Sequence, residues 1–378
     1  MTVCQPLGNI KYHGGGTYGY IIFKRLCEKD VSSVIAYIDK SRFIDPSIKE
    51  CIEHKNIQVI DAHDVDLTKA LQNNISLLYS PLFRSEYLKL RELEIPIYIT
   101  FHGMRKLEMN RDKYEYVYAM NWQGILKSVI KKTPLYNFFY KKFYTEYEEF
   151  LTFPNVRIVT VSNHSKNSIR YYYPSLEEKN IEVYYSPSTT INDYQKVEPF
   201  RREKYYLIIS ADRWLKNSFR TLLAFDHIFE KFPEHKGKVV VVGLKSGNLL
   251  IRKLKHKERF EVFDYIDRIT LESMFCGAYL LAYPSLNEGF GYPPLEAMKY
   301  RTPVITSAFS AIAEICDDAV LYTNPYSVDE IAMRILQMEN EDLYQMYENK
   351  SLERYDYICR KQKEDLDKLT TKLLSFVK

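Results

Sequence analysis

Short apolar runs separated by charged segments repeat along the first half of the chain. Each intervening segment is long enough to form a helix. The runs are Val34–Ile38, Ile57–Ile60, Ile75–Ser80, Ile97–Phe101 and Arg157–Ser162. Strands that alternate with helices form βαβ units, which build a parallel sheet. The pattern therefore predicts an α/β domain in the N-terminal half.

The same alternation returns after residue 205. The apolar runs there are Tyr206–Ser210, Val239–Gly243, Phe260–Ile266, Ala278–Tyr283 and Thr302–Ser307. A polar stretch from Pro187 to Pro199 separates the two sets and has the composition of an interdomain linker. We therefore expect two doubly wound, Rossmann-like α/β domains, at residues 1–190 and 200–355, followed by a helical segment at 356–378.

One turn in the second half has the composition of an anion site. Gly289 and Gly291 leave the backbone amides around Phe290 open to a ligand, and Pro293 and Pro294 mark the start of a helix. A glycine-bearing turn before a helix N-terminus binds anions, and diphosphates are its usual occupants.

Two acids, Glu288 and Glu296, flank this turn eight residues apart. We expect Glu296 in the first helical turn, where a carboxylate suits the positive end of the macrodipole. The order of acids, glycines and prolines resembles the donor-site signature of retaining glycosyltransferases, family 4 in particular; a surface turn that carries two acids by chance is the alternative. The resemblance implies that Glu288 contacts hydroxyls of the donor sugar and Glu296 the nucleotide ribose. It also implies that the amides of Phe290 and Gly291 face the sugar and the diphosphate.

The resemblance covers nearly the whole chain. It implies the glycosyltransferase-B architecture, in which two domains face each other across a cleft and the last helix crosses back to the N-terminal domain. Gly15 and Gly16, ahead of a helix predicted from Thr17 to about Glu28, resemble the family loop that faces donor and acceptor. Only Thr2–Cys4 remain for the first strand, which a doubly wound sheet places centrally.

Two cations follow the strand at 206–210. Arg213 and Lys216 precede a helix that starts around Phe219, and cations there can neutralise a diphosphate as a sugar departs. Solvated surface cations are the other interpretation. The resemblance gives the pair the phosphate-holding role, although the spacing is Arg-x-x-Lys-Asn rather than adjacent Arg-Lys, so Lys216 matches the family better than Arg213.

Three further residues are candidates for the site. His102 follows the run PIYITF and should lie at the carboxyl edge of the sheet, where open α/β sheets bind ligands; a hydrogen-bonded histidine that closes a strand is the alternative. The resemblance implies that His102 reaches the donor sugar across the cleft. It also implies that Tyr265 and Ile266 hold the nucleobase.

The segment 121–143 is basic and rich in large apolar side chains. It contains no acid and five lysines: Lys127, Lys131, Lys132, Lys141 and Lys142. An interfacial helix has this composition, but so does an amphipathic helix pair with its lysines in water. Pro134 predicts two short helices. A peripheral membrane contact through 121–143 would suit a lipid-linked acceptor.

Composition narrows the class of protein. At 378 residues, with 46% hydrophobic and 27% charged residues, the chain is typical of a globular protein with two domains. A net charge of +4 does not indicate nucleic-acid binding. The six cysteines show no CxxC spacing, which indicates neither a zinc site nor a disulfide framework. With no bilayer-length apolar run and no signal peptide, we expect a cytoplasmic enzyme, peripheral to the inner face of the membrane if 121–143 binds lipid.

The resemblance implies a retaining glycosyltransferase that moves a sugar from a nucleotide-diphosphate donor to a carbohydrate or lipid-linked saccharide acceptor, in bacterial polysaccharide or lipopolysaccharide assembly. No DxD-like motif occurs in the segments expected to line the cleft, which agrees with the family's metal-independent mechanism, so we expect no metal and no other cofactor. Two alternatives remain open: a sugar-nucleotide epimerase or glycan phosphorylase of the same fold, and a non-catalytic module that binds nucleotide sugars or glycans.

Overall fold

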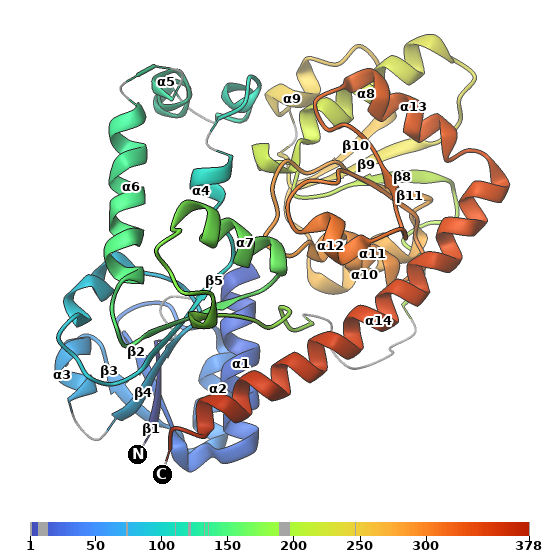
Figure 1. Ribbon diagram of the computed structural model, residues 1–378. Coiled ribbons are helices and arrows are strands. Elements are labelled where there is room, and N and C mark those ends of the chain that lie inside the picture. Colours follow the sequence, from blue (N-terminus) through green and yellow to red (C-terminus); the bar gives the residue numbers. More distant parts are fainter. Residues whose placement is uncertain are drawn as a thin grey trace. The chain divides into compact units, whose positions relative to one another are not determined.

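The computed structural model describes residues 2–6, 14–72, 75–109, 111–119, 122–131, 133–134, 136–188, 197–245 and 247–377. The chain divides into two compact units (Figure 1). Unit 1 comprises Met1–Met104, Tyr140–Thr189 and Cys359–Lys378, and unit 2 comprises Arg105–Phe139 and Thr190–Ile358. Each unit contains one parallel sheet with helices between successive strands, which confirms the predicted fold class of two doubly wound α/β domains.

The sheet of unit 1 has the strand order β3-β2-β1-β4-β5-β6-β7. The strands are β1 Thr2–Pro6, β2 Val34–Ile38, β3 Gln58–Asp61, β4 Ile75–Ser80, β5 Ile97–Phe101, β6 Val156–Thr160 and β7 Ile181–Val183. The first strand pairs with β2 and β4 and thus lies where a doubly wound sheet places it. All five residues of β5 are buried, as expected of an inner parallel strand.

Capping residues mark the helix starts of unit 1. Asp45 accepts a hydrogen bond from the backbone of Ser47 at the start of α2, and Ser162 accepts one from Ser165 at the start of α7. The helical segments are α1 Gly14–Asp30, η1 Val31–Ser33, α2 Pro46–Lys55, α3 Leu67–Leu71, η2 Ser85–Leu90, α7 Asn163–Tyr172 and η4 Glu178–Asn180.

The sheet of unit 2 has the strand order β10-β9-β8-β11-β12-β13. The strands are β8 Tyr205–Ile208, β9 Lys238–Val242, β10 Phe260–Phe263, β11 Leu280–Tyr283, β12 Val304–Thr306 and β13 Leu321–Tyr322. The order reverses between the central strands β8 and β11, and open α/β sheets bind ligands beyond the carboxyl ends of the strands at such a switch point.

The helices of unit 2 fall into two packed groups. Helix α8 packs against α9 and α13, whereas α11 packs against α10 and α12. Right-handed crossovers place the two groups on opposite faces of the sheet. The helical segments are η5 Trp214–Lys216, α8 Ser218–Lys231, α9 Leu249–Arg252, η6 Lys257–Arg259, α10 Arg268–Gly277, α11 Tyr292–Met298, α12 Ile312–Cys316 and α13 Val328–Gln337.

Residues 105–139 belong to unit 2, although the expected domain boundaries placed them with the N-terminal half. They form α4 Arg105–Glu108, η3 Glu115–Tyr118, α5 Trp122–Ile130 and the start of α6 Tyr136–Leu151. Val117 is only 2% exposed and lies in the hydrophobic core of unit 2. The two helices expected on either side of Pro134 are present, but α6 continues to Leu151 and is not short.

The last helix, α14 Glu341–Leu374, runs unbroken for 34 residues (Figure 1). Its residues as far as Ile358 belong to unit 2 and those from Cys359 onward to unit 1. In unit 1, Asp367 pairs with Arg25 at 2.6 Å and Lys372 pairs with Glu182 at 2.7 Å. The charged residues of this helix therefore include groups that pair with other elements of unit 1.

Two expectations concern disulfides and the membrane. Five cysteines, Cys27, Cys51, Cys276, Cys316 and Cys359, are free within the described part of the chain. Among the described residues, no helix combines the length and the apolar character that crossing a membrane requires.

Candidate functional site

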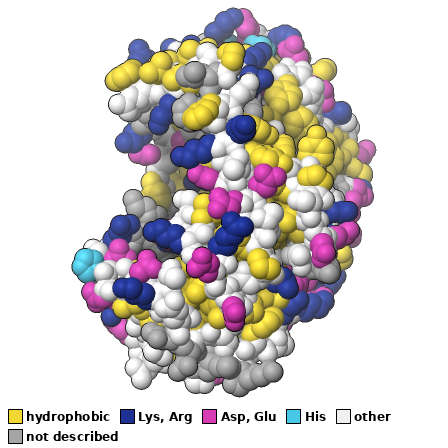
Figure 2. All heavy atoms as spheres, turned by 60° about the vertical axis from the view of Figure 1, so that its left-hand side comes forward, with side chains coloured by type: hydrophobic (Ala, Val, Ile, Leu, Met, Phe, Trp, Pro, Cys, Tyr) yellow, Lys and Arg dark blue, Asp and Glu magenta, His cyan; other side chains and the backbone are white. Residues whose placement is uncertain are grey.

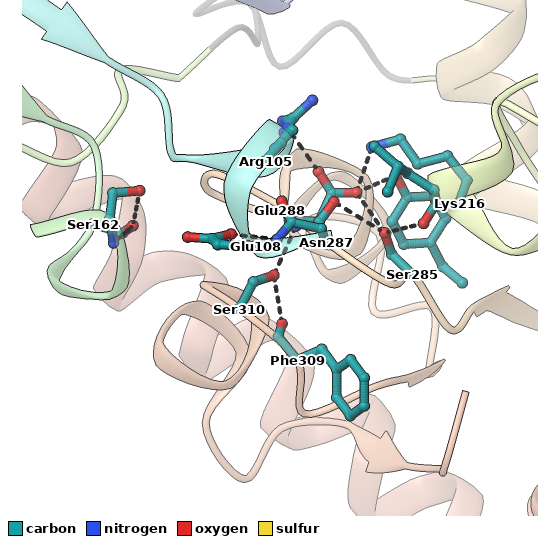
Figure 3. A network of polar contacts seen from close by, with 12 residues as sticks. Arg105, Glu108, Ser162, Lys216, Ser285, Asn287, Glu288, Phe309 and Ser310 are labelled. Atoms are coloured by element: carbon teal, nitrogen blue, oxygen red, sulfur yellow. Dashed lines mark hydrogen bonds and ion pairs between the residues drawn. The ribbon is translucent and has the colours of Figure 1, made fainter. Parts of the chain in front are cut away.

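Lys216 and Glu288 meet at the switch point of unit 2. Lys216 ends η5 in the loop after β8, and Glu288 lies in the turn after β11. The Lys216 ammonium donates a hydrogen bond to Oε1 of Glu288 (Figure 3). Their side chains are only 8% and 5% exposed. The two residues come together because both loops leave the carboxyl ends of the central strands.

Asn217 holds the lysine turn in place. It adopts a left-handed conformation with φ of 60°, which asparagine tolerates better than most residues. Its buried Nδ2 donates to the carbonyl oxygens of Pro284 at 3.1 Å and Pro325 at 2.6 Å. Asn217 thereby joins the loop after β8 to the loop after β11 and sets the position of the neighbouring Lys216.

The Glu288 carboxylate accepts several hydrogen bonds. Tyr283 and Ser285 donate their hydroxyls to Oε1 at 2.6 Å and 3.1 Å, and Nη2 of Arg105 lies 3.8 Å from Oε2. Burial alone would raise the pKa of Glu288, but the charges of Lys216 and Arg105 and the hydrogen bonds outweigh burial and lower it. Burial lowers the pKa of Lys216, although the negative charge of Glu288 opposes this decrease. We infer that Glu288 is ionised at neutral pH.

The glycine turn has the backbone geometry that glycine permits. Gly291 has φ of 110° at the N-cap of α11, a conformation that strains any side chain. The backbone N–H of Glu288 donates to Ser310 at 2.7 Å and fixes the start of the turn (Figure 3). The Phe290 ring is buried. That the amides of Phe290 and Gly291 face a ligand remains a prediction.

Glu296 lies elsewhere in its helix than expected. Helix α11 begins at Tyr292, so Glu296 is its fifth residue, and the first turn contains no acid. The expectation of a first-turn carboxylate was wrong, because the helix starts before the two prolines. Instead, Arg268 donates from Nη1 to Oε1 of Glu296 at 2.7 Å.

The remaining predicted residues of unit 2 lie in two connecting segments. Arg213 is exposed at the N-cap of η5, and its charge acts on Lys216 and Tyr283. Strand β10 ends at Phe263, earlier than expected, so Tyr265 and Ile266 lie in the connection to α10, with Tyr265 79% exposed. Their roles toward phosphate and base remain predictions.

The predicted residues of unit 1 are described within that unit. Gly15 and Gly16 lie in the first turn of α1, which begins at Gly14 and not at Thr17 as expected. The predicted glycine loop falls partly on residues 7–13, which lie outside the described residues.

His102 follows β5 in unit 1. Its Nε2 lies 2.9 Å from the carbonyl oxygen of Pro81, and its ring packs edge-on against Tyr18 at 4.7 Å. Because a carbonyl only accepts, Nε2 carries the proton. The hydrogen-bonded histidine that was the alternative is therefore present, and a role for His102 toward the sugar remains a prediction.

Sequence reasoning missed four side chains that contact the two acids: Arg105, Tyr283, Ser285 and Arg268. Position after a strand would have pointed to Arg105, three residues beyond His102, and to Ser285, two residues beyond β11. No comparable signal marks Arg268, whose contact with Glu296 joins residues 28 positions apart. Among the described residues, no group of three or more His, Cys, Asp or Glu side chains could hold a metal ion.

Comparison with solved structures gives the fold. The glycosyltransferase from Rickettsia africae ESF-5 superposes with a TM-score of 0.67 at 16% identity, over all of this chain and 98% of the other. Sucrose-phosphate synthase from Thermosynechococcus elongatus superposes with a TM-score of 0.69 at 13% identity, over 99% of this chain and 100% of the other. Together with the two doubly wound units, these likenesses show the glycosyltransferase-B fold.

Comparison of sequences finds a similar family and similar relatives. The O-antigen chain mannosyltransferase RfbU of Salmonella typhimurium is 27% identical over 210 residues, which are 54% of this chain and 57% of the relative, so the chain spans little more than half of that protein. The family model described as "Glycosyl transferases group 1" matches residues 190–357, which include Lys216, Glu288 and Glu296. Residues 190–357 of this chain are therefore similar to the group 1 glycosyl transferases.

Proposed function

We propose that the protein is a glycosyltransferase that moves a hexosyl group from a nucleotide-diphosphate donor to a hydroxyl of a carbohydrate or lipid-linked saccharide. The observation that carries the proposal is the buried contact between Lys216 and Glu288 at the switch point of unit 2. Both residues lie within the part of the chain that matches the group 1 family.

The charges of the site suit a nucleotide sugar. Lys216, with Arg213 nearby, would bind the diphosphate, because a leaving group that carries negative charge is stabilised by fixed cations. Glu288 would accept hydrogen bonds from sugar hydroxyls, and Glu296 from the ribose. The exposed connection at Tyr265 and Ile266 would take the base.

The proposed reaction retains the anomeric configuration. The bond between the anomeric carbon and the phosphate oxygen breaks, and the acceptor oxygen forms its bond to that carbon on the same face. The acceptor proton passes to the departing phosphate oxygen, so the reaction needs no protein nucleophile and no metal. The protein would contribute positioning and charge stabilisation.

The relatives guide the choice of substrate. RfbU is named as an O-antigen chain mannosyltransferase, and a second relative, 38% identical over 78 residues, carries a similar name. We therefore propose a role in bacterial surface-polysaccharide assembly, with a mannosyl group as the first sugar to test.

A transfer assay tests the proposal. UDP- and GDP-activated hexoses, with mannose among them, are screened by thermal shift, because ligand binding raises the melting temperature with occupancy. Each donor that binds is then incubated with lipid-linked saccharides and polysaccharide fragments. We expect release of nucleoside diphosphate and a retained linkage in the product. Interconversion of the donor without an acceptor would indicate an epimerase, phosphate-dependent glycan cleavage a phosphorylase, and binding without turnover a binding module; each would contradict the proposal.

We also propose that α5 rests against the cytoplasmic face of a membrane. One stripe of this helix, at intervals of three and four residues, is apolar and exposed: Trp122 (70%), Ile125 (46%), Leu126 (48%) and Val129 (51%). Phe138 at the start of α6 is 73% exposed. Exposed apolar stripes of this size on a helix are typical of interaction surfaces.

Exposed lysines occur on both helices, Lys127 on α5 and Lys141 and Lys142 on α6. Figure 2 shows hydrophobic side chains next to Lys and Arg on one face of the molecule. Each lysine near an anionic surface adds about 1 kcal/mol. The combination favours anionic lipid and suits a lipid-linked acceptor.

Vesicle binding tests the membrane contact. We expect the protein to sediment with phosphatidylglycerol vesicles and not with phosphatidylcholine vesicles, and Ile125→Glu with Val129→Glu to abolish sedimentation. Met333→Glu, at a methionine 59% exposed on α13, is the matched control and should bind as the parent does. Equal binding by all variants, or none by the parent, would contradict the contact.

A further inference from the structure

We infer that Arg268 and Glu272 position Glu296 to read the ribose hydroxyls of a ribonucleoside diphosphate. The inference rests on the proposed function, which places the nucleotide in unit 2. It starts from the observation that Glu296 is not in the first turn of α11, so the helix terminus does not account for its orientation.

Arg268 joins two carboxylates. Its Nη1 donates to Oε1 of Glu296 at 2.7 Å, and its Nε donates to Oε1 of Glu272 at 3.0 Å. The two acids belong to different helices, α11 and α10. A planar guanidinium with donors in fixed directions can hold both at once, which a single ammonium group does less well.

Glu272 is itself anchored. Its Oε2 accepts hydrogen bonds from Lys299 at 3.0 Å and from Tyr300 at 2.6 Å, and its side chain is 13% exposed. Burial would raise the pKa of Glu272, but these hydrogen bonds and the charge of Arg268 outweigh burial and lower it. Glu272 is thus an ionised, fixed partner that keeps Arg268 in one orientation.

The network closes a ring between two helices. From Glu296 in α11 it passes through Arg268 and Glu272 in α10, and it returns to Lys299 at the end of α11. A glutamate side chain on its own has several rotatable bonds, and ordering them on binding weakens affinity. Arg268 imposes that order beforehand.

A hydrogen bond from Arg268 is compatible with ribose recognition. A carboxylate has about four acceptor sites on its two oxygens, so Glu296 can accept from Arg268 and from hydroxyl donors. Arg268 also directly follows the connection that holds Tyr265 and Ile266, where Asp267 caps α10. The arginine therefore lies between the segment proposed to bind the base and the glutamate proposed to bind the ribose.

Paired ligands test the inference. Affinities for UDP and GDP, and for their 2′,3′-dideoxy counterparts, are measured by calorimetry with the parent protein and with Glu296→Gln, Arg268→Ala and the double variant. We expect Arg268→Ala to lower the affinity for the preferred ribonucleotide about ten- to a hundredfold, which is the range of one charged hydrogen bond. The affinity for the dideoxynucleotide should fall less than about twofold. In the Glu296→Gln background, Arg268→Ala should add no further loss for either ligand.

Two further variants separate a positioning role from a role in folding. Arg268→Lys should retain part of the preference for the ribonucleotide. Glu272→Gln, which does not replace Arg268 but weakens its anchor, should reduce that preference. Arg252→Ala, at an exposed arginine of α9, is the matched control and should bind both ligands as the parent does.

Three results would overturn the inference. Equal losses for the ribo- and dideoxynucleotide in Arg268→Ala would mean direct contact with base or phosphate, or a purely structural role. A full additional loss in the Glu296→Gln background would mean that Arg268 acts independently of Glu296. If the parent binds no nucleoside diphosphate, the proposed function fails and this inference fails with it; that result is distinct, because it appears without any substitution.

Discussion

Two buried ion pairs in unit 2 invite comparison. Lys216 and Glu288 are 8% and 5% exposed, and Arg220 and Asp112 are 3% and 6% exposed. The Arg220–Asp112 pair is bidentate, at 3.1 Å and 2.9 Å, and the guanidinium lies over the ring of Tyr114 at 4.6 Å. One arginine therefore faces one carboxylate inside a packed contact.

The pair in the candidate site has a different charge balance. Around Glu288 are Lys216 and Arg105, with Arg213 near enough to act on Lys216. Arg105 is 42% exposed. Burial and pairing are common to both places, so neither identifies a site. The two places differ in their cations: three, Lys216, Arg105 and Arg213, act at the switch point of the sheet. Under the proposed function, an incoming diphosphate would balance these charges.

Removing the Asp112 charge should have the largest effect. Asp112→Asn leaves Arg220 buried without its counterion, and we expect the free energy of unfolding of unit 2 to fall by about 3–5 kcal/mol. Tryptophan fluorescence in urea reports this unit, since the chain has two tryptophans and both Trp122 and Trp214 belong to unit 2. Asp318→Asn is the control, because Asp318 also pairs with a cation, Lys350, but its side chain is 77% exposed. This substitution should change the free energy of unfolding by less than about 1 kcal/mol. Equal effects of the two substitutions would contradict the assignment.

Substitution of Lys216 or Glu288 should lower the rate of sugar transfer. We expect Glu288→Ala and Lys216→Ala each to lower turnover about a hundredfold, or about 2.7 kcal/mol in the barrier, while the protein stays folded. For Lys216→Ala, stability should fall less than in Asp112→Asn, because Arg105 can approach the carboxylate that loses Lys216. Steady-state rates and urea unfolding check both parts. Parental rates in either variant would remove that residue from the site.

A less buried cluster gives the smallest effect. Burial would raise the pKa of Glu339, but hydrogen bonds from His235, Lys204 and Tyr206 outweigh it and lower the pKa to about 2 from an ordinary 4.5. A depressed carboxyl pKa stabilises the folded state above the ordinary value, and this contribution is lost as pH falls from about 4.5 to about 2. We expect Glu339→Gln to reduce stability at pH 7 by about 1–2 kcal/mol, after allowance for its 30% exposure, and by less near pH 3. A difference that does not change with pH would contradict the ionic origin.

Local pattern was enough to predict much of the fold. The strands at 34–38, 75–80 and 97–101 have the predicted bounds, since continuous apolar runs in an inner parallel strand end where the chain returns to solvent. The convergence of Lys216 and Glu288 follows from strand order, which alternating strands and helices imply.

Other features depend on contacts between distant residues. The packing of 105–139 on unit 2 rests on pairs such as Asp112 with Arg220, 108 positions apart, and no local pattern encodes it. The predicted start of α11 was wrong because prolines are accepted at more than one early helical position, and here Tyr292 precedes them in the helix. The contact of Arg268 with Glu296 likewise depends on the packing of α10 against α11.

The segment 105–139 has a practical consequence for dissecting the protein. A fragment excised at the family limits, residues 190–357, would lack Val117 from its core and Asp112 from its buried arginine. Such a piece would expose apolar surface on α8 and carry an uncompensated charge. The compact unit that contains Lys216 and Glu288 is thus discontinuous in sequence, and a fragment cut at the limits of the family match would lack part of it.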